Sequence, residues 1–330
     1  MEFSDLSRLA SAHVEARIVH VAVSLGLFDA LERESKNAGA VASFLQCDSR
    51  ATALLLNALV ALALLQKSGG HYSLTDVARA YLLRSSSSYL GGMILFDASL
   101  WDAWGKLEES VRSGNPARTP DMYQQIPEET ERFIGAMDSL VRARGDAEIL
   151  WQKLDWAGVN DLLDVGSGPG TYPIYFCGQN PRLRATIFDL PATLAITEKY
   201  VREAGLADRI RLIPGDYRSD GLPGEHDLVL LSNIIHAESD QENGRLVRNA
   251  YACLRKHGRI VIKDHHLDDS LAHPPVGAIF SLLMLLTTAR GRCYSFDEVR
   301  SWLHDAGFAN IEQIDLSPPL TSSLIVGEKA

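Results

Sequence analysis

Apolar positions follow one spacing in the first part of the chain and another in the second. Up to about residue 100, apolar side chains recur at helical spacing, as in Leu9, Ala12 and Ala16. From residue 161 onward, short apolar runs alternate with longer amphipathic stretches, the pattern of strands joined by helices. We therefore predict an α/β protein with a helical N-terminal region and a doubly wound, mostly parallel sheet.

The N-terminal region has the element order of a winged helix. The expected elements are helices over residues 9–23, 27–31, 41–46, 49–65 and 76–81, with strands over 65–67 and 71–74. Asp48 or Ser49 can cap the fourth helix, and Thr75 can cap the fifth. Gly69-Gly70 forms the turn between the two strands.

Two further helices are expected between this region and the sheet. Residues 89–113 predict one long helix that Gly114 ends, and residues 128–150 predict another. A polar loop flanked by Pro120 and Pro127 separates them.

Seven apolar runs predict the strands of the sheet. They cover residues 161–165, 185–189, 210–214, 227–231, 259–264, 310–315 and 322–326, with helices over 240–254, 275–288 and 296–306. The last two strands are expected to pair as an antiparallel hairpin around Ser317-Pro318-Pro319. A dehydrogenase sheet more often ends on parallel strands.

The first strand runs into a glycine-rich turn with an acid at the junction: Asp164, Gly166, Ser167, Gly168 and Gly170. Alternating glycines let the backbone turn tightly and approach a ligand, while the next helix directs free N–H groups into the same space. The carboxylate repels a pyrophosphate and attracts a ligand that carries an ammonium and a sulfonium. Position 171, which the dinucleotide fingerprint reserves for a small residue, is Thr171, so the fit to NAD is incomplete.

Acids also end the next two strands. Asp189 is placed to meet ribose hydroxyls at the tip of the second strand. Gly215-Asp216-Tyr217 offers a carboxylate for an adenine amino group and a ring on which the base can stack. Three such acids, each closing a strand–helix unit, predict a nucleotide site at the carboxyl edge of the sheet.

These motifs, together with residues 231–236, resemble class I S-adenosylmethionine-dependent O-methyltransferases, the group of plant caffeic acid, animal acetylserotonin and many bacterial natural-product enzymes. The resemblance covers nearly the whole chain and implies S-adenosyl-L-methionine as cofactor. It implies that the glycine turn holds the methionine part, Asp189 the ribose, and Asp216 and Tyr217 the adenine. The implied cofactor residues are Asp164, Gly166, Ser167, Gly168, Gly170, Asp189, Leu190, Gly215, Asp216, Tyr217, Ser232 and Asn233.

The resemblance also implies that His236 is the general base. A neutral imidazole can take a proton from a phenol while the oxygen attacks the sulfonium methyl in line, releasing S-adenosylhomocysteine. Asp264 ends the neighbouring strand and can orient His236 by accepting its other N–H, where the family commonly has glutamate. The family usually continues His-Asp-Trp, whereas this chain continues Ala237-Glu238, a departure that concerns the acceptor and the chemistry near the base and not the fold.

The methyl acceptor is expected to be a small, aromatic or polyketide-like molecule. Met137, Phe280 and Met284 are the candidate pocket residues, with plain core packing as the alternative for each. His236, Asp264 and one of His265 or His266 have the residue types of an iron site, but their spacing is not diagnostic, and we predict no metal. Successive side chains on an extended segment point to opposite faces, so at most one of these two histidines is expected to face the pocket.

Composition narrows the partners and the compartment. The 330 residues, of which 46% are hydrophobic, carry a net charge of −10, which argues against nucleic acid or an anionic membrane as partner. The first hundred residues hold eight basic and nine acidic side chains, so this winged helix is not expected to bind a duplex. Four scattered cysteines and the absence of a basic leader favour a reducing cytoplasm.

Domain organisation follows from the resemblance. Residues 1–100 are expected to form a winged-helix-like dimerisation domain of a homodimer, 101–150 a helical linker contributing to the substrate pocket, and 151–330 the catalytic domain with the Rossmann-like sheet. The alternatives are a C- or N-methyltransferase or a non-methylating cyclase that binds the same cofactor, and a ligand-sensing winged-helix regulator. An NAD enzyme is a further alternative.

Overall fold

A computed structural model describes residues 1–120, 122–316 and 318–330. The chain divides into two compact units. The first comprises Met1–Trp101 and Gly135–Ala143, and the second comprises Asp102–Ile134 and Arg144–Ala330. Within the described residues, every helix is too short or too polar to span a bilayer.

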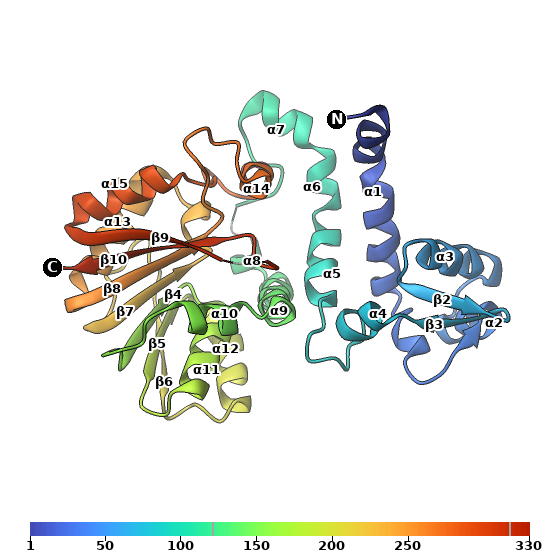
Figure 1. Ribbon diagram of the computed structural model, residues 1–330, viewed down its shortest axis with the longest axis horizontal. Coiled ribbons are helices and arrows are strands. Elements are labelled where there is room, and N and C mark those ends of the chain that lie inside the picture. Colours follow the sequence, from blue (N-terminus) through green and yellow to red (C-terminus); the bar gives the residue numbers. More distant parts are fainter. Residues whose placement is uncertain (121, 317) are drawn as a thin grey trace. The chain divides into compact units, whose positions relative to one another are not determined.

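The first unit contains the helices and the hairpin predicted for a winged helix (Figure 1). The elements are α1 (Phe3–Ser24), η1 (Asp29–Leu31), β1 (Lys36–Asn37), α2 (Ala38–Leu45), α3 (Ser49–Ala61), β2 (Leu65–Ser68), β3 (His71–Leu74) and α4 (Asp76–Tyr81). The strands pair in the order β1-β3-β2. Asp48 caps α3 by accepting from the Ala51 N–H at 2.8 Å, and Thr75 caps α4. Leu27, Leu56 and Leu59 are fully buried in the core of this unit.

The prediction of a single helix over residues 89–113 is wrong. Three helices occupy this stretch, α5 (Gly91–Ser99), α6 (Trp101–Gly105) and α7 (Leu107–Ser113). At Leu100 the N–H bonds to the Asp97 carbonyl, and at Lys106 to the Ala103 carbonyl, three residues back instead of four. Such tighter turns interrupt the α-helical ladder. Gly114 ends the last helix in the left-handed conformation, as predicted.

The helix predicted over residues 128–150 is also divided. It forms α9 (Pro127–Arg144) and α10 (Asp146–Lys153), separated by Gly145 at φ +69°. A left-handed glycine ends an α-helical run, so the chain changes direction at this point. The short helix α8 (Met122–Gln125) lies in the polar loop predicted between the two prolines, and Asp121 lies outside the described residues.

The second unit is built on the predicted seven-stranded sheet. The strands are β4 (Asp161–Val165), β5 (Arg184–Asp189), β6 (Ile210–Pro214), β7 (His226–Ser232), β8 (Leu254–Asp264), β9 (Phe308–Asp315) and β10 (Ser323–Lys329). Their order is β6-β5-β4-β7-β8-β10-β9. The first five are parallel, and β10 runs antiparallel to both β8 and β9, which confirms the predicted hairpin pairing. Ser317 in the connection lies outside the described residues.

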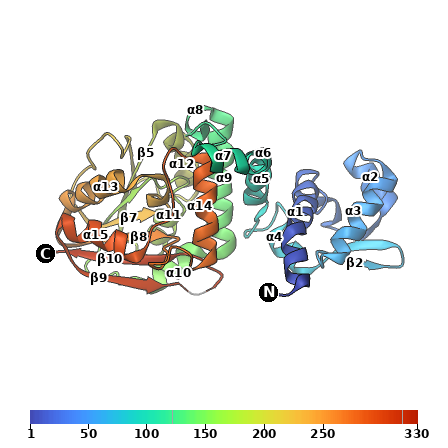
Figure 2. The ribbon, with the colours of Figure 1, turned by 90° about the horizontal axis from the view of Figure 1, so that it is seen from above.

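Helices cover both faces of this sheet. They are α11 (Thr171–Gln179), α12 (Pro191–Glu203), α13 (Asp240–Ala252) and α15 (Phe296–Ala306). The apolar helix α14 (Pro275–Thr287) instead contacts α7 and the short helix η2 (Ile235–Ala237). Figures 1 and 2 show α13 and α15 side by side over one face, where Val247 and Leu303 join the buried strand residues Val229 and Ile260. A central strand such as β7 is therefore apolar over its whole middle. The carboxyl ends of the five parallel strands share one edge.

Candidate cofactor and catalytic site

In the glycine turn after β4, the backbone passes close to two side chains, those of Ile234 and Tyr217. Gly166, Gly168 and Gly170 have φ of +64°, +60° and +75°. A Cβ on Gly166 would lie 2.4 Å from Ile234 Cδ1 and 3.6 Å from Tyr217 Cε1. Only glycine fits this conformation and this space. The turn leads directly into the N-terminus of α11, whose first N–H groups have no helical partner.

Asp164 is buried at the base of this turn. Its Oδ2 accepts from the Ser167 hydroxyl at 2.6 Å, while Oδ1 has no hydrogen-bond partner in the described part of the chain. Burial raises the pKa of this carboxyl to about 7, against the Ser167 hydrogen bond. An unpaired buried carboxylate oxygen fits a ligand that brings its own ammonium group.

Asp189, at the end of β5, braces the same turn. Its Oδ2 accepts from the Gly168 N–H at 2.8 Å and its Oδ1 from the Leu190 N–H at 2.7 Å. Burial raises the pKa of Asp189 to about 6, although both backbone hydrogen bonds favour the carboxylate. The structure thus brings Asp164, Asp189 and the glycines together.

The third predicted segment, after β6, lies against the turn through its aromatic ring. Tyr217 Cε1 would be in van der Waals contact with a Cβ on Gly166, at 3.6 Å, and the Tyr217 hydroxyl donates to Glu238 Oε1 at 2.8 Å. Gly215 passes so close to the Phe188 ring that a Cβ would lie 2.3 Å from it. Asp216 Oδ1 accepts from the Arg218 N–H at 2.9 Å.

Ser232 ends β7 at the same edge, and Asn233 follows it. Asn233 has φ +56°, and its N–H donates to the Lys263 carbonyl at 2.7 Å, which holds the turn against the end of β8. Ile234 then contacts the glycine turn. All the predicted cofactor segments therefore meet along one edge of the second unit.

His236 and Asp264 form a close pair. His236 lies in η2 (Ile235–Ala237), and its Nδ1 is 2.9 Å from Asp264 Oδ1 and 3.1 Å from Oδ2. Burial opposes the charge on Asp264, but the charge and hydrogen bond of His236 outweigh it and hold the pKa of Asp264 well below its usual range. This contact engages Nδ1 and leaves Nε2 as the nitrogen available to an acceptor.

Of the three predicted substrate residues, the structure places one beside His236. The Phe280 ring is perpendicular to the His236 imidazole at 4.9 Å between centroids, and it also contacts His265 at 5.0 Å. Met284 is buried in α14. Met137 belongs to the first unit, and its place in a pocket stays a prediction.

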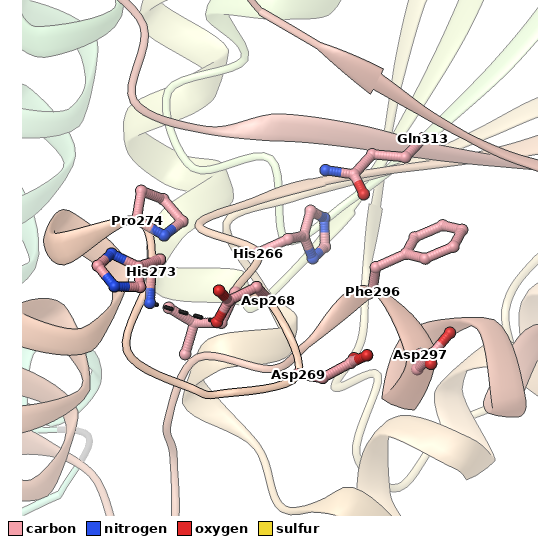
Figure 3. Close-up of a pocket in the computed structure, with 9 residues that line it drawn as sticks. His266, Asp268, Asp269, His273, Pro274, Phe296, Asp297 and Gln313 are labelled. Carbon is pink, nitrogen blue, oxygen red and sulfur yellow. Dashed lines mark hydrogen bonds between the residues drawn. The ribbon is translucent and has the colours of Figure 1, made fainter.

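The two histidines after Asp264 point to different surroundings, as predicted. His265 Nδ1 lies 3.0 Å from the Thr321 carbonyl and its ring contacts Phe280, whereas His266 lines a separate cavity of about 450 Å³ with Asp268 and His273 (Figure 3). Across residues 1–120, 122–316 and 318–330, no three His, Cys, Asp or Glu side chains are arranged to hold a metal ion.

Two buried polar clusters near the site were not predicted from the sequence. Glu238, which is 4% exposed, accepts from Tyr217 and from Arg218, and the unusual His-Ala-Glu sequence was the signal that could have indicated it. Lys263 and Asp146 form a fully buried ion pair at 3.3 Å. A lysine inside an apolar strand was the corresponding signal in the sequence.

Comparisons with known proteins agree with this geometry. The family model described as O-methyltransferase domain matches residues 106–309, and the O-methyltransferase dimerisation domain matches residues 7–84. The 3-hydroxy-5-methyl-1-naphthoate 3-O-methyltransferase of Streptomyces sahachiroi is 31% identical over 98% of this chain and 95% of its own. The N,N-dimethyltransferase OxyT of Streptomyces rimosus is 29% identical over 94% and 92%. The solved structure of PigF with SAH has a TM-score of 0.90 at 27% identity and covers 100% of both chains.

The fold and the edge site together define a methyltransferase that uses S-adenosylmethionine, which confirms the predicted cofactor and enzyme class. The chain belongs to the O-methyltransferase family, with the family's dimerisation domain at its N-terminal end. The predicted resemblance is therefore confirmed.

Proposed function

We propose that the protein transfers a methyl group from S-adenosylmethionine to a hydroxyl of a small aromatic or polyketide-like molecule, with His236 as general base. The observation that carries this proposal is the contact of His236 Nδ1 with the buried Asp264 carboxylate at 2.9 Å. The pair lies at the edge of the sheet that holds the glycine turn, and the Phe280 ring packs against the imidazole. An apolar ring at this place favours an aromatic acceptor.

The residues around His236 can hold and move one proton. Asp264 accepts the Nδ1 hydrogen, so the lone pair of Nε2 is free to take the proton of the acceptor hydroxyl. Asp264 stays ionised because its pKa is lowered, and its charge stabilises the imidazolium that forms. When bound, S-adenosylmethionine supplies an electrophilic methyl group on a sulfonium.

The proposed cofactor contacts are assigned to the side chains at this edge of the sheet. The unpaired Oδ1 of Asp164 suits the ammonium of the methionine part, because a buried carboxylate gains most from a cation. Asp189 is assigned to the ribose hydroxyls, and Asp216 with Tyr217 to the adenine. Ser232 and Asn233 are the remaining residues proposed to contact the cofactor.

Turnover with methyl-labelled cofactor and a panel of phenols tests this function. His236→Gln should lower turnover by about 100-fold or more, since general-base catalysis contributes about 10² to 10⁴. Its Kd for S-adenosylhomocysteine, measured by calorimetry, should stay within about twofold of the unaltered protein. His304→Gln is the matched control, because that side chain is 83% exposed on α15. Full turnover by the His236→Gln protein would remove the base from the mechanism.

Transfer to nitrogen is the second candidate. It is supported by the similarity to OxyT, an N,N-dimethyltransferase, and by Ala237-Glu238 at the place where the family has Asp-Trp. An amine needs less help from a base than a phenol, so His236→Gln should then have a small effect above the pKa of the amine. Amine and phenol acceptors assayed side by side distinguish the two reactions.

A homodimer is the proposed assembly. Large apolar side chains are exposed on α1 and just before it, and the dimerisation domain includes most of this helix. They are Met1, which precedes the helix, and Phe3, Leu6, Leu9 and Val14. Exposed apolar surface of this kind is typical of a protein–protein interface. Light scattering should give twice the chain mass, and Leu6→Glu with Leu9→Glu should give a monomer. A monomeric unaltered protein at micromolar concentration would contradict the proposal.

A further inference from the structure

We propose that Glu238 is a positioning residue for the nucleotide half of the site, and that its buried carboxylate fixes the Tyr217 ring beside the glycine turn. The inference rests on the proposed function, because it takes Tyr217 to face the adenine. Glu238 acts through Tyr217 and Arg218 and touches no reacting atom.

Two donors from one segment converge on a single oxygen of this carboxylate. The Tyr217 hydroxyl is 2.8 Å from Glu238 Oε1, and the Arg218 Nε is 2.7 Å from the same atom. Glu238 is 4% exposed, so its charge is kept by these contacts and not by water. Hydrogen bonds to a buried carboxylate are shorter and stronger than those between neutral groups.

The backbone that carries Glu238 is itself fixed. The buried Tyr294 hydroxyl donates to the Glu238 carbonyl at 2.6 Å. Ser239, the next residue, caps α13 in a reciprocal capping box with Glu242. Asn243 in α13 donates to the Ile235 carbonyl at 2.9 Å, so the segment is held on both sides. The carboxylate therefore has one position in which to receive Tyr217.

The Tyr217 ring has apolar and charged surroundings. Like Ile213 and Leu222, it packs against the buried core, and its edge lies 3.6 Å from the position of a Cβ on Gly166. The Arg218 guanidinium lies 5.9 Å from the ring centroid. A buried tyrosine hydroxyl usually finds a hydrogen-bond partner, and the bond to Glu238 fixes the direction of the long axis of the ring. Glu238 thus holds in place the ring that the adenine would meet.

Asp264 and Glu238, the two buried carboxylates near η2, therefore have separate proposed roles. Asp264 orients His236, the middle residue of η2, and Glu238, the residue that follows η2, orients Tyr217. Loss of Glu238 should weaken cofactor binding and leave proton transfer intact. A residue with a merely structural role would instead change both together.

Calorimetry with S-adenosylhomocysteine tests whether Glu238 acts on cofactor binding alone. Glu238→Ala should raise Kd at least tenfold, and Glu238→Gln, which keeps an acceptor oxygen but loses the charge, should raise it less. Tyr217→Phe should also raise Kd, and adding Glu238→Ala to it should change Kd by less than twofold further, because both changes remove the same contact. With saturating cofactor, the kcat and the acceptor KM of the Glu238 variants should stay within twofold of the values for the unaltered protein.

Glu198→Ala is the matched control, since it removes an ion pair with Arg202 at 2.6 Å on the exposed face of α12. Where Glu238→Ala does not fold, Glu238→Gln replaces it in the cycle with Tyr217→Phe. An unchanged Kd in the folded Glu238 variants, or effects of Glu238 and Tyr217 that multiply, overturns the proposal. An unaltered protein that binds S-adenosylhomocysteine but methylates nothing refutes the proposed function alone. One that does not bind it refutes both.

Discussion

Asp164→Asn should stabilise the protein in the absence of cofactor and weaken its affinity for the cofactor. Asp164 is 1% exposed, and one of its oxygens has no hydrogen-bond partner in the described residues. Burial raises its pKa from 3.8 to about 7, and the charge of Asp189 adds to this effect. At about 1.4 kcal/mol for each pH unit, ionising this carboxyl in the folded chain costs up to about 4 kcal/mol.

The sign of the pH dependence follows from the raised pKa. The folded chain holds this proton more tightly than the unfolded chain, so the stabilising contribution is complete below pH about 4. It is lost as the pH rises through about 7. The Asp164→Asn protein has no proton to lose. Its advantage in the free energy of unfolding should therefore be near zero at acid pH and largest near pH 8.

Urea unfolding between pH 5 and 8 without cofactor measures this advantage, and calorimetry with S-adenosylhomocysteine measures the accompanying loss of affinity, expected to be at least tenfold. Asp227→Asn is the control of opposite sign. Burial opposes the charge on Asp227, but its hydrogen bonds with Arg255 and backbone N–H groups lower its pKa, so its replacement should destabilise the protein at neutral pH. An Asp164→Asn protein that is less stable at pH 8, or that binds as tightly as before, refutes the reasoning.

Three further changes test the catalytic pair and its support. Asp264→Asn removes a buried charged partner of His236 and should lower kcat by about 10- to 100-fold, since such hydrogen bonds contribute about 1.5–3 kcal/mol. Turnover at saturating substrates measures this loss, and an unchanged kcat would contradict the expectation. Gly291→Ala places a Cβ 2.3 Å from the His236 carbonyl oxygen, so it should lower kcat at least about tenfold by displacing the proposed base. Calorimetry should show cofactor affinity within about twofold, and equal losses of both would indicate general disruption. Asp146→Ala leaves Lys263 and Arg144 without their shared carboxylate and should lower the free energy of unfolding by about 3–5 kcal/mol in urea; a loss below about 1 kcal/mol would show that the buried pair is not needed for stability.

Local signals in the sequence were sufficient to predict most of the fold. Caps such as Asp48 and Ser295 act on N–H groups within three residues, so the start of a helix can be read from neighbouring positions. Breaks inside helices were harder. Those at Leu100 and Lys106 involve residues that are common in helices, and only the change of hydrogen-bond partner in the folded chain reveals them. Gly145 was a visible signal that the apolar periodicity outweighed.

The placement of the candidate site residues could be predicted where each lies at the end of its own strand. A parallel sheet gathers the carboxyl ends of its strands, so Asp164, Asp189 and His236 meet wherever their strands are adjacent. Side-chain partners were less predictable. Tyr217 and Glu238 are 21 residues apart, and no periodic pattern links them. Their contact depends on a rotamer and a buried charge, which the packing of the whole edge determines. In that sense Glu238 is informative, because it stands where the resemblance predicts tryptophan. A buried carboxylate must acquire donors, and this one takes them from Tyr217 and Arg218, in the segment proposed for the adenine.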